Sequence, residues 1–330
     1  EAQNKAINHI DGPMLVLAGP GSGKTTVITR RVEKLIRHGI NPMNILVITF
    51  TKAAANEMKE RFYRLMADGT EPYRNVTFGT FHAVFFTILK HAYNLSADNI
   101  IREEERYAIV KAAIGQYELD IEDEREFTAN VLGEIARVKS DRIPIQNYYS
   151  TNCPADIFRK IYDEYNTRLK NTRKLDFEDM LGYTYELLTQ RSDILSAWQG
   201  KYKYILIDEF QDINKVQYDT IRLLAAPENN LFIVGDDDQS IYKFRGATIR
   251  NILEFEKEYK DAVTIRLEQN YRSTQNILNA ANEVISNNTM RKGKTLWTEN
   301  GQGEKIKVHT AENERDEANF IAQTILDGVA

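Results

Sequence analysis

Residues 14–26 read Met-Leu-Val-Leu-Ala-Gly-Pro-Gly-Ser-Gly-Lys-Thr-Thr, and this stretch decides the fold. An apolar run typical of a buried strand leads into a glycine-rich turn, which is followed at once by Lys24 and Thr25. Glycines let successive backbone N–H groups point inward at the start of a helix, where the helix dipole favours an anion. The stretch therefore predicts a phosphate-binding loop between a strand and a helix.

The positions of this loop predict how a nucleoside triphosphate is held. We expect Lys24 to reach the β- and γ-phosphates and the Thr25 hydroxyl to ligate Mg²⁺. The strict pattern begins with glycine where this chain has Ala18, which is also small. A dinucleotide-binding loop is excluded because Lys24 stands where its third glycine would be. The residues expected to contact the nucleotide here are Ala18, Gly19, Pro20, Gly21, Ser22, Gly23, Lys24, Thr25 and Thr26.

A second apolar run, residues 204–207, ends in Asp208 and Glu209. Ligands of a parallel α/β sheet lie at the carboxyl ends of its strands, so both acids are expected at the edge that carries the phosphate loop. There Asp208 would hold Mg²⁺, and Glu209 would polarise the attacking water. Acids after a strand are often helix caps, and only the pairing with the phosphate loop favours the catalytic interpretation.

Further segments resemble superfamily 1 helicases of the UvrD, PcrA and Rep type. Residues 208–212 read Asp-Glu-Phe-Gln-Asp, and residues 235–246 read Gly-Asp-Asp-Asp-Gln-Ser-Ile-Tyr-Lys-Phe-Arg-Gly after another apolar run. Both are similar to motifs of that family, the first to its Walker B motif. The remaining motifs follow in the family's order, at Gln3 and at residues 49–55, 79–82, 175–179 and 267–273.

The resemblance implies an ATP site between two α/β domains. Gln3 is expected to read the adenine, and Tyr271 to stack on it. Gln239 would sense the γ-phosphate or the water, and Arg272 would reach the γ-phosphate from the second domain. The expected catalytic residues are Glu209, Lys24, Gln239 and Arg272, and the expected nucleotide contacts outside the loop are Gln3, Tyr271, Arg272 and Arg245.

The resemblance also implies a surface for single-stranded DNA. Aromatic side chains at strand ends are candidates for stacking on bases, each contributing roughly 1–3 kcal/mol. Phe81 is a candidate that core packing would explain equally well. A run of cations at residues 159–174 is expected near the strand as well. The expected DNA contacts are Phe50, Thr51, Thr80, Phe81, His82, Phe177, Tyr242 and Phe244.

Composition bounds these expectations. The chain has 330 residues, 42% hydrophobic and 28% charged, which is typical of a globular protein. Its net charge of −5 predicts that DNA binds to a local patch. The single Cys153 excludes an internal disulfide, and the five histidines lack metal-ligand spacing, so no transition metal is expected. Without an apolar run of membrane-spanning length or a signal layout, a cytoplasmic protein is expected, associated with the nucleoid when on DNA.

Alternating strand and helix patterns predict the α/β class, with strands near 14–18, 45–49 and 75–79. Between about 92 and 173 only helical periodicity is found. We expect a RecA-like P-loop NTPase domain with a parallel sheet, made of residues 1–91 and 174–268, with an all-α insertion at 92–173. Residues 269–330 are expected to begin a second RecA-like domain, with a helix near 273–286, a strand at 305–309 and a helix after Asn313.

Together these patterns predict an ATP-dependent DNA helicase that uses ATP and Mg²⁺ to move along single-stranded DNA. By resemblance it moves 3′-to-5′ and acts on single strands and single/double-strand junctions. The chain is expected to be a fragment that hydrolyses ATP feebly alone, since the family's later motifs are missing. Two alternatives stay open, namely the helicase subunit of a helicase–nuclease and a nucleotide-dependent DNA-binding module without unwinding. An unrelated P-loop kinase is disfavoured by residues 208–212 and 239–242.

Overall fold

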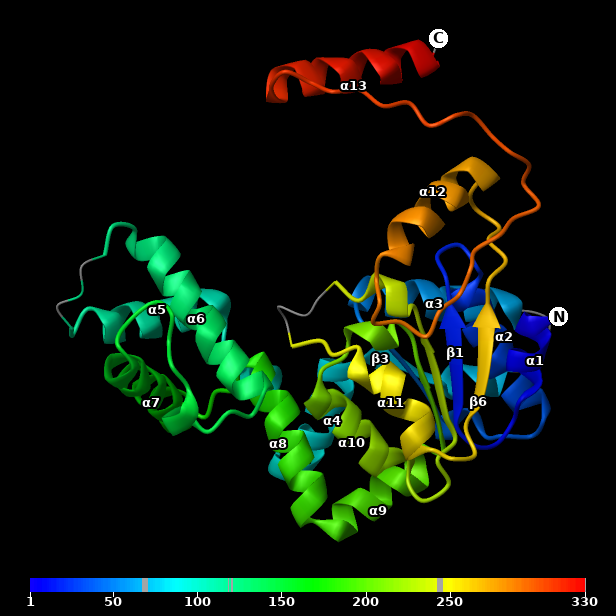
Figure 1. Cartoon of the computed structure of the whole chain (residues 1–330). Helices are drawn as coiled ribbons and strands as arrows, with labels where there is room; N and C mark the ends of the chain where they lie inside the picture. The colour runs from blue at the N-terminus through cyan, green and yellow to red at the C-terminus, as the bar shows by residue number, and fades with distance from the viewer. Residues whose placement is uncertain (67–70, 118, 120, 242–245, 330) are drawn as a thin grey trace.

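The computed structural model describes residues 1–66, 71–117, 119, 121–241 and 246–329, without the side chains of residues 71, 72 and 329. Its centre is a six-stranded parallel sheet in the order β3-β2-β4-β5-β1-β6 (Figure 1). This sheet confirms the predicted α/β class. The strands are β1 (Met14–Ala18), β2 (Ile45–Thr49), β3 (Thr77–Thr80), β4 (Tyr204–Ile207), β5 (Leu231–Gly235) and β6 (Val263–Leu267).

Four of the strands are apolar runs covered on both faces. All residues of β1, β2, β4 and β5 are buried, as expected for a parallel sheet between two helical layers. In β1, Val16 pairs with Val234 of β5 and with Ile265 of β6. Because β4, β5 and β1 are neighbours, the loops that follow them emerge side by side at one edge of the sheet.

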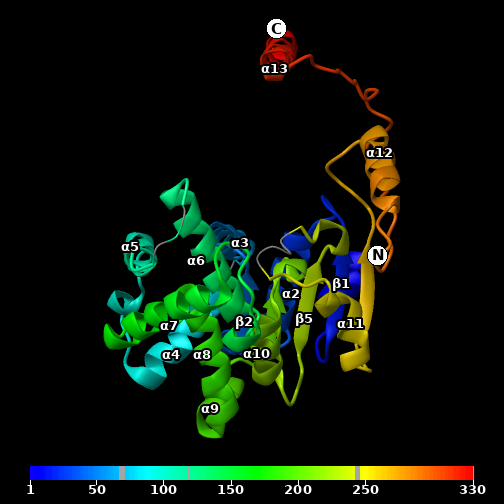
Figure 2. The same ribbon diagram turned by 60° about the vertical axis from the view of Figure 1, so that its left-hand side comes forward.

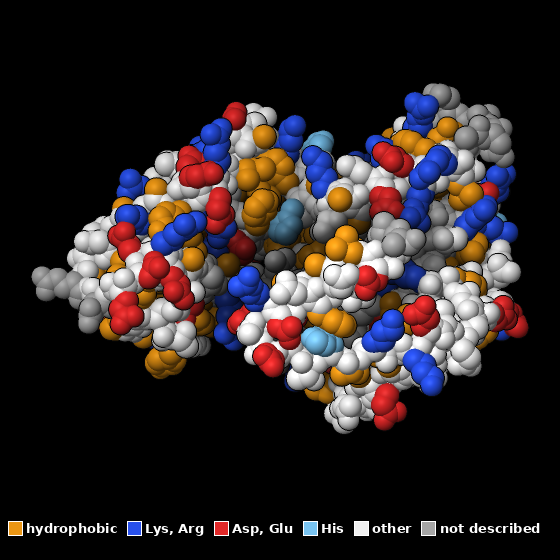
Figure 3. All heavy atoms as spheres, turned by 90° about the horizontal axis from the view of Figure 1, so that it is seen from above, with side chains coloured by type: hydrophobic (Ala, Val, Ile, Leu, Met, Phe, Trp, Pro, Cys, Tyr) orange, Lys and Arg blue, Asp and Glu red, His pale blue; other side chains and the backbone are white. Residues whose placement is uncertain are grey.

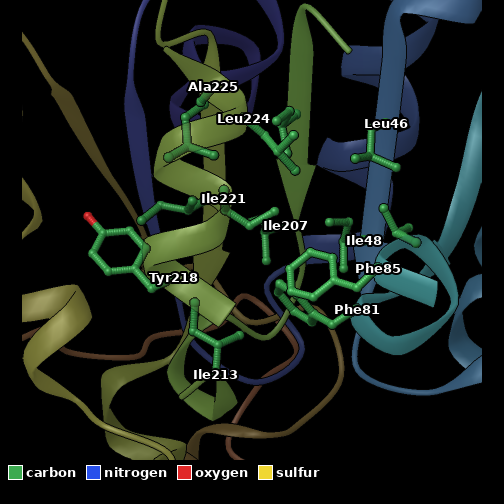
Figure 4. Packing of buried hydrophobic residues seen from close by; sticks show 14 of the residues in the cluster. Leu46, Ile48, Phe81, Phe85, Ile207, Ile213, Tyr218, Ile221, Leu224 and Ala225 are labelled. Carbon is green, nitrogen blue, oxygen red and sulfur yellow. The ribbon is translucent and has the colours of Figure 1, made fainter. Parts of the chain in front are cut away.

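Alternate residues along the strands point into two separate cores, as the period of a strand dictates. Leu15 and Ile207 belong to the first core, while Val16 and Leu206 belong to the second. Figure 4 shows Phe81 and Phe85 packed near Ile48 in the first core. The first core is covered by α4 (Phe81–Tyr93), α8 (Phe177–Gln190), α9 (Ser192–Lys201), α10 (Lys215–Ala225) and α11 (Arg250–Glu258), and the second by α1 (Ala2–Asn8), α2 (Lys24–Arg37) and α3 (Lys52–Leu65).

Three helices form a lobe beside the sheet, as Figures 1 and 2 both show. They are α5 (Glu103–Ile114), α6 (Glu124–Ser140) and α7 (Ala155–Asn171). Their apolar faces pack around a core of their own, which includes Val131, Phe158 and Tyr165. All three lie within residues 92–173, where the sequence has helical periodicity, and we refer to them as the insertion.

The chain after the sheet contains two further helices, α12 (Gln275–Ser286) and α13 (Glu314–Val329), close to the predicted positions. The strand predicted at 305–309 is wrong, because residues 301–311 have no helix or strand. Figures 1 and 2 show α13 and the chain leading to it apart from the sheet, where no neighbouring strand can satisfy the backbone hydrogen bonds. Among the helices in the described ranges, none has the apolar length that a membrane crossing requires.

Candidate functional site

The loop between β1 and α2 has the shape that its glycines predict. Gly21 and Gly23 have φ of 66° and 88°, in the left-handed region where a Cβ is disfavoured. A Cβ on Gly21 would also lie 2.7 Å from Nδ2 of Asn270. The Ser22 hydroxyl donates to the Gly19 carbonyl at 2.6 Å, which closes the turn. The helix then begins at Lys24, so its free N–H groups face the loop.

The structure brings Lys24 together with the acids that follow β4. Its Nζ lies 3.8 Å from Oε2 of Glu209. Asp208 is buried, and burial together with the Glu209 carboxylate raises the pKa of Asp208 to about 7. Glu209 itself has a φ of 52°, an uncommon backbone conformation for a residue with a side chain. Strained residues of this kind cluster at functional sites, where the surrounding structure holds them.

The donor set at this edge fits a magnesium ion. The hydroxyl of Thr25 and the carboxylate of Asp208 are the oxygen ligands that Mg²⁺ prefers. Carboxylates crowd this site, and burial together with the Glu209 charge raises the pKa of Asp212 to about 6. Oδ1 of Asp212 is buried and has no hydrogen-bond partner. A divalent cation would relieve this crowding of negative charge.

Gln211 is a site residue that the sequence analysis missed. Its Nε2 donates to Oε2 of Glu209 at 2.8 Å. Its Oε1 accepts from the backbone N–H of Asp236, at the end of β5, at 2.9 Å. One amide therefore ties the predicted base to the loop that carries Gln239. The position of Gln211 inside the Asp-Glu-Phe-Gln-Asp segment, two residues after Glu209, was the sequence signal for this role.

The segment after β6 lies directly on the phosphate loop. Asn270 donates through Nδ2 to the Pro20 carbonyl at 2.7 Å, and the N–H of Tyr271 donates to the Gly21 carbonyl at 2.9 Å. Oδ1 of Asn270 accepts the N–H of Arg272 at 2.8 Å. The side chains of Tyr271 and Arg272 are exposed beside the loop. Asn270 was also missed, although it lies between residues to which the sequence analysis gave roles.

Gln3 lies against the phosphate loop from the opposite direction, donating through Nε2 to the Ser22 carbonyl at 2.8 Å. Arg31 of α2, which is 1% exposed, fixes the N-terminal segment that carries Gln3. The guanidinium donates to the carbonyls of Ala6 at 3.2 Å and Ile10 at 3.0 Å. Of the nucleotide contacts predicted outside the loop, Gln3 and Tyr271 therefore both bond to its backbone.

Several of the predicted DNA contacts gather between the sheet and the insertion. Phe50 and His82 line a cavity of about 390 Å³, together with Arg137 of α6. The rings of His82 and Phe177 meet edge to face, with centroids 5.2 Å apart. Phe177 is 48% exposed, so it is accessible to a ligand in solution. Burial lowers the pKa of His82, which favours the neutral imidazole.

Three other predicted DNA contacts have structural roles. Phe81 is 2% exposed and packs against Phe85, so we correct its assignment as a stacking residue to a core residue. Thr51 and Thr80 cap α3 and α4, where their hydroxyls accept backbone N–H groups. The predictions for Tyr242, Phe244 and Arg245 fall outside the described residues.

Charge on the surface is mixed. Figure 3 shows acidic and basic side chains interspersed over one face of the molecule. In the basic run, Arg168, Lys170 and Arg173 are exposed at the end of α7 and just beyond it. The net charge of −5 and this mixture both favour a local DNA patch over a general electrostatic attraction.

Comparisons with known proteins agree with this geometry. Residues 1–260 match the UvrD/REP helicase N-terminal domain, and residues 265–329 match the UvrD-like helicase C-terminal domain. ATP-dependent DNA helicases PcrA are similar to the chain, with 41% identity in Leuconostoc citreum and in Staphylococcus aureus (strain Mu50 / ATCC 700699). A probable DNA helicase II homolog of Rickettsia conorii is 42% identical.

These alignments cover 98% of this chain but 44%, 45% and 50% of the three relatives. The chain therefore spans about half the length of the curated relatives it matches. The matched residues include the phosphate loop, the acids after β4 and the segment that follows β6. On these matches, the chain belongs to the UvrD/Rep helicase family.

Proposed function

We propose that this chain supplies the ATP site and part of the single-strand site of an ATP-dependent DNA helicase that moves 3′-to-5′. The observation that carries the proposal is the junction of segments distant in sequence at one sheet edge. The acids after β4 and the Asn270–Arg272 segment each contact the phosphate loop or the start of its helix there, Glu209 through Lys24 and Asn270 through the Pro20 carbonyl. Lys24 begins the helix after the loop, and Arg272 follows Asn270, which bonds to the loop, so a triphosphate bound there would have two cations near it.

The chain's own residues suggest how hydrolysis proceeds. The loop N–H groups and Lys24 would bind the phosphates, and Mg²⁺ held by Thr25 and Asp208 would neutralise charge on them. Glu209 would take a proton from the attacking water, with Gln211 fixing the orientation of its carboxylate. Arg272 would stabilise the charge that develops on the transferred phosphoryl group.

Coupling to DNA follows from the position of the second surface. The cavity lined by Phe50 and His82 is also lined by Asp212 and Asn214, which follow the Walker B acids. A change at Glu209 on hydrolysis therefore has a short path to the proposed strand site. We propose that single-stranded DNA, including strands at duplex junctions, stacks on Phe177 and passes through this cavity. We also propose that the protein works in the cytoplasm, associated with the nucleoid when it is on DNA.

The experiment that tests the proposal compares the wild type with Glu209→Gln. Phosphate release from ATP is measured under single-turnover conditions, with protein in excess and with oligo(dT) present or absent. We expect the wild-type rate to stay low even with oligo(dT) present, because the chain spans about half the length of its curated relatives. The variant should lose roughly 10²–10⁴-fold in rate, because an amide cannot accept the proton. Its affinity for Mg·ATPγS should stay within about twofold of the wild type, because the phosphate loop is intact.

Two results would count against the proposal. A wild type that binds no Mg·ATPγS would remove the nucleotide site itself. Parallel losses of binding and rate in Glu209→Gln would make Glu209 a metal-shell or structural residue rather than the base. A melting temperature measured on each sample excludes unfolding as the cause.

A further inference from the structure

Lys294 is a buried cation that neither the motifs nor the mechanism above uses. Its side chain is 1% exposed. Its Nζ lies 2.7 Å from Oδ1 of Asp236, 2.5 Å from Oδ1 of Asp237 and 2.7 Å from Oδ2 of Asp238. An ammonium group has three donors, so each can serve one carboxylate. We call these four residues the Lys294 cluster.

The carboxylates of the Lys294 cluster need a cation. Their ligand oxygens lie within 4.8 Å of one another, close enough for a metal ion, but the lysine ammonium already lies among them. Burial lowers the pKa of Lys294, but the carboxylates outweigh burial and raise it, so the lysine stays charged. Arg291 also pairs with Asp238, its Nε lying 2.8 Å from Oδ1. Without Lys294, Asp236 and Asp237 would therefore lose their cation and repel each other in a buried place, which favours another conformation of their loop.

This loop leads directly to Gln239. The N–H of Gln239 donates to the Asp236 carbonyl at 3.0 Å, and the N–H of Asp238 donates to the Asp236 carboxylate at 3.1 Å. Asp236 is also the residue whose N–H bonds to Gln211, the partner of Glu209. The cluster therefore fixes the backbone from which Gln239 projects.

Lys294 lies in a segment, residues 291–297, that also contacts the phosphate loop. Leu296 packs directly over Gly19, where any Cβ would collide with it. The N–H of Asn270 donates to the Trp297 carbonyl at 2.8 Å, which links the segment to the residues that precede Arg272. The segment thus contacts the Gln239 loop, the phosphate loop and the arginine-bearing segment at once.

We propose that Lys294 is a positioning residue that holds the Gln239 loop where it can read the γ-phosphate and couples that loop to the segment bearing Arg272. The inference rests on the proposed ATP function, because it assigns Gln239 to the third phosphate. The proposed role of Lys294 concerns only the γ-phosphate, whereas the phosphate loop also binds the phosphates that ADP and ATP share. Loss of Lys294 should therefore affect ATP-like ligands and spare ADP.

The test is the ratio of dissociation constants for Mg·ADP and Mg·ATPγS in Lys294→Met, which keeps the side-chain length and removes the charge. We expect Mg·ATPγS to bind about tenfold more weakly than to the wild type, within the usual range of coupling between sites. Mg·ADP should change by less than about twofold. The matched control is Lys292→Met, whose ammonium pairs with Glu256 outside the cluster, and it should leave the ratio unchanged.

The outcomes separate the possible roles of Lys294. Equal weakening of both nucleotides, or no change in either, overturns the inference and leaves Lys294 a structural residue, while the proposed ATP function survives. A wild type that binds neither nucleotide overturns both. If Lys294→Met does not fold, Lys294→Gln combined with Asp237→Asn removes one charge of each sign, and the same loss of preference for Mg·ATPγS is expected.

Discussion

Two buried lysines, Lys139 and Lys294, each bind more than one aspartate, but they join different parts of the molecule. Lys139, near the end of α6, lies 2.6 Å from Asp176 and 2.9 Å from Asp179 of the α8 region. It fastens the insertion to the sheet domain, whereas Lys294 fastens the chain after β6 to the loop that follows β5.

A buried lysine paired with aspartates can therefore position residues of the proposed DNA site in one place and of the proposed nucleotide site in another. A buried ion pair contributes little net stability, but breaking it leaves an unpaired charge, so each cluster specifies one arrangement of its neighbours. The neighbours differ. Asp176 caps α8, whose first residue is the proposed stacking residue Phe177. The three aspartates of the Lys294 cluster directly precede Gln239. Disruption of the first should therefore affect DNA, and disruption of the second should affect the nucleotide.

The largest expected effect is that of Lys139→Met. Removing the cation leaves Asp176 and Asp179 buried without it, which should lower the free energy of unfolding by about 3–5 kcal/mol. Urea denaturation measures this loss. The folded variant should bind oligo(dT) more weakly and Mg·ADP normally.

The control for Lys139→Met is Lys160→Met. Lys160 is exposed on α7, where its ammonium lies over the Tyr117 ring. Its loss should change stability by no more than about 0.5 kcal/mol. A change below about 1 kcal/mol in Lys139→Met would show that the insertion does not depend on this cluster.

A smaller effect is expected for Phe177→Ala. Loss of an exposed aromatic face should weaken oligo(dT) binding by about 1–3 kcal/mol, measured by fluorescence anisotropy. Affinity for Mg·ATPγS, measured on the same sample, should not change, because Phe177 contacts His82 rather than the phosphate loop. Equal losses of both ligands would place Phe177 in the structural framework. Unchanged DNA binding would remove it from the strand site.

The smallest effect comes from the two aspartates that share Lys139. Burial opposes ionisation of Asp176, but Lys139 outweighs it and the pKa is lowered, so its charged form stabilises the fold. Burial and the Asp176 charge raise the pKa of Asp179 to about 6. The folded protein therefore takes up a proton at Asp179 as pH falls through 6. In the unfolded chain Asp179 takes up this proton only at lower pH, near the ordinary pKa of an aspartate.

The sign of this effect gives a pH test. Between pH 7 and pH 5 the free energy of unfolding of the wild type should rise by about 1 kcal/mol relative to Asp179→Asn. Asp176→Asn removes a charge that helps to raise the pKa of Asp179, so its free energy of unfolding should rise less than that of the wild type over this range. Denaturation of all three proteins at both pH values measures it. A relative fall for the wild type would mean that Asp179 is ionised in the fold.

Local patterns predicted much of this molecule. Residues 14–26 identified the first strand, the phosphate loop and the second helix, because a buried strand followed by glycines and Lys-Thr has few other structures. The α/β class followed from the same alternation of patterns. The strand predicted at 305–309 did not form, since a strand pattern cannot show whether a partner strand lies beside it.

Partnerships between distant segments were not predictable from local patterns. Lys294 reads as one cation among several, and only the fold brings it to aspartates more than 50 positions earlier. Gln211 and Asn270 were visible inside quoted motifs, but their hydrogen bonds depend on the pairing of β4 with β5 and of β1 with β6. Phe81 was misassigned because an aromatic residue after a strand can face either the core or the solvent.

We propose that this sheet edge is an ATP site built on the phosphate loop, and a calorimetric titration of the chain and of Lys24→Ala with Mg·ATPγS tests this most directly. Hydrogen bonds to a charged group contribute about 1.5–3 kcal/mol each, so we expect saturable binding that the variant weakens at least about tenfold. Equal affinity of the two proteins for Mg·ATPγS would contradict the account.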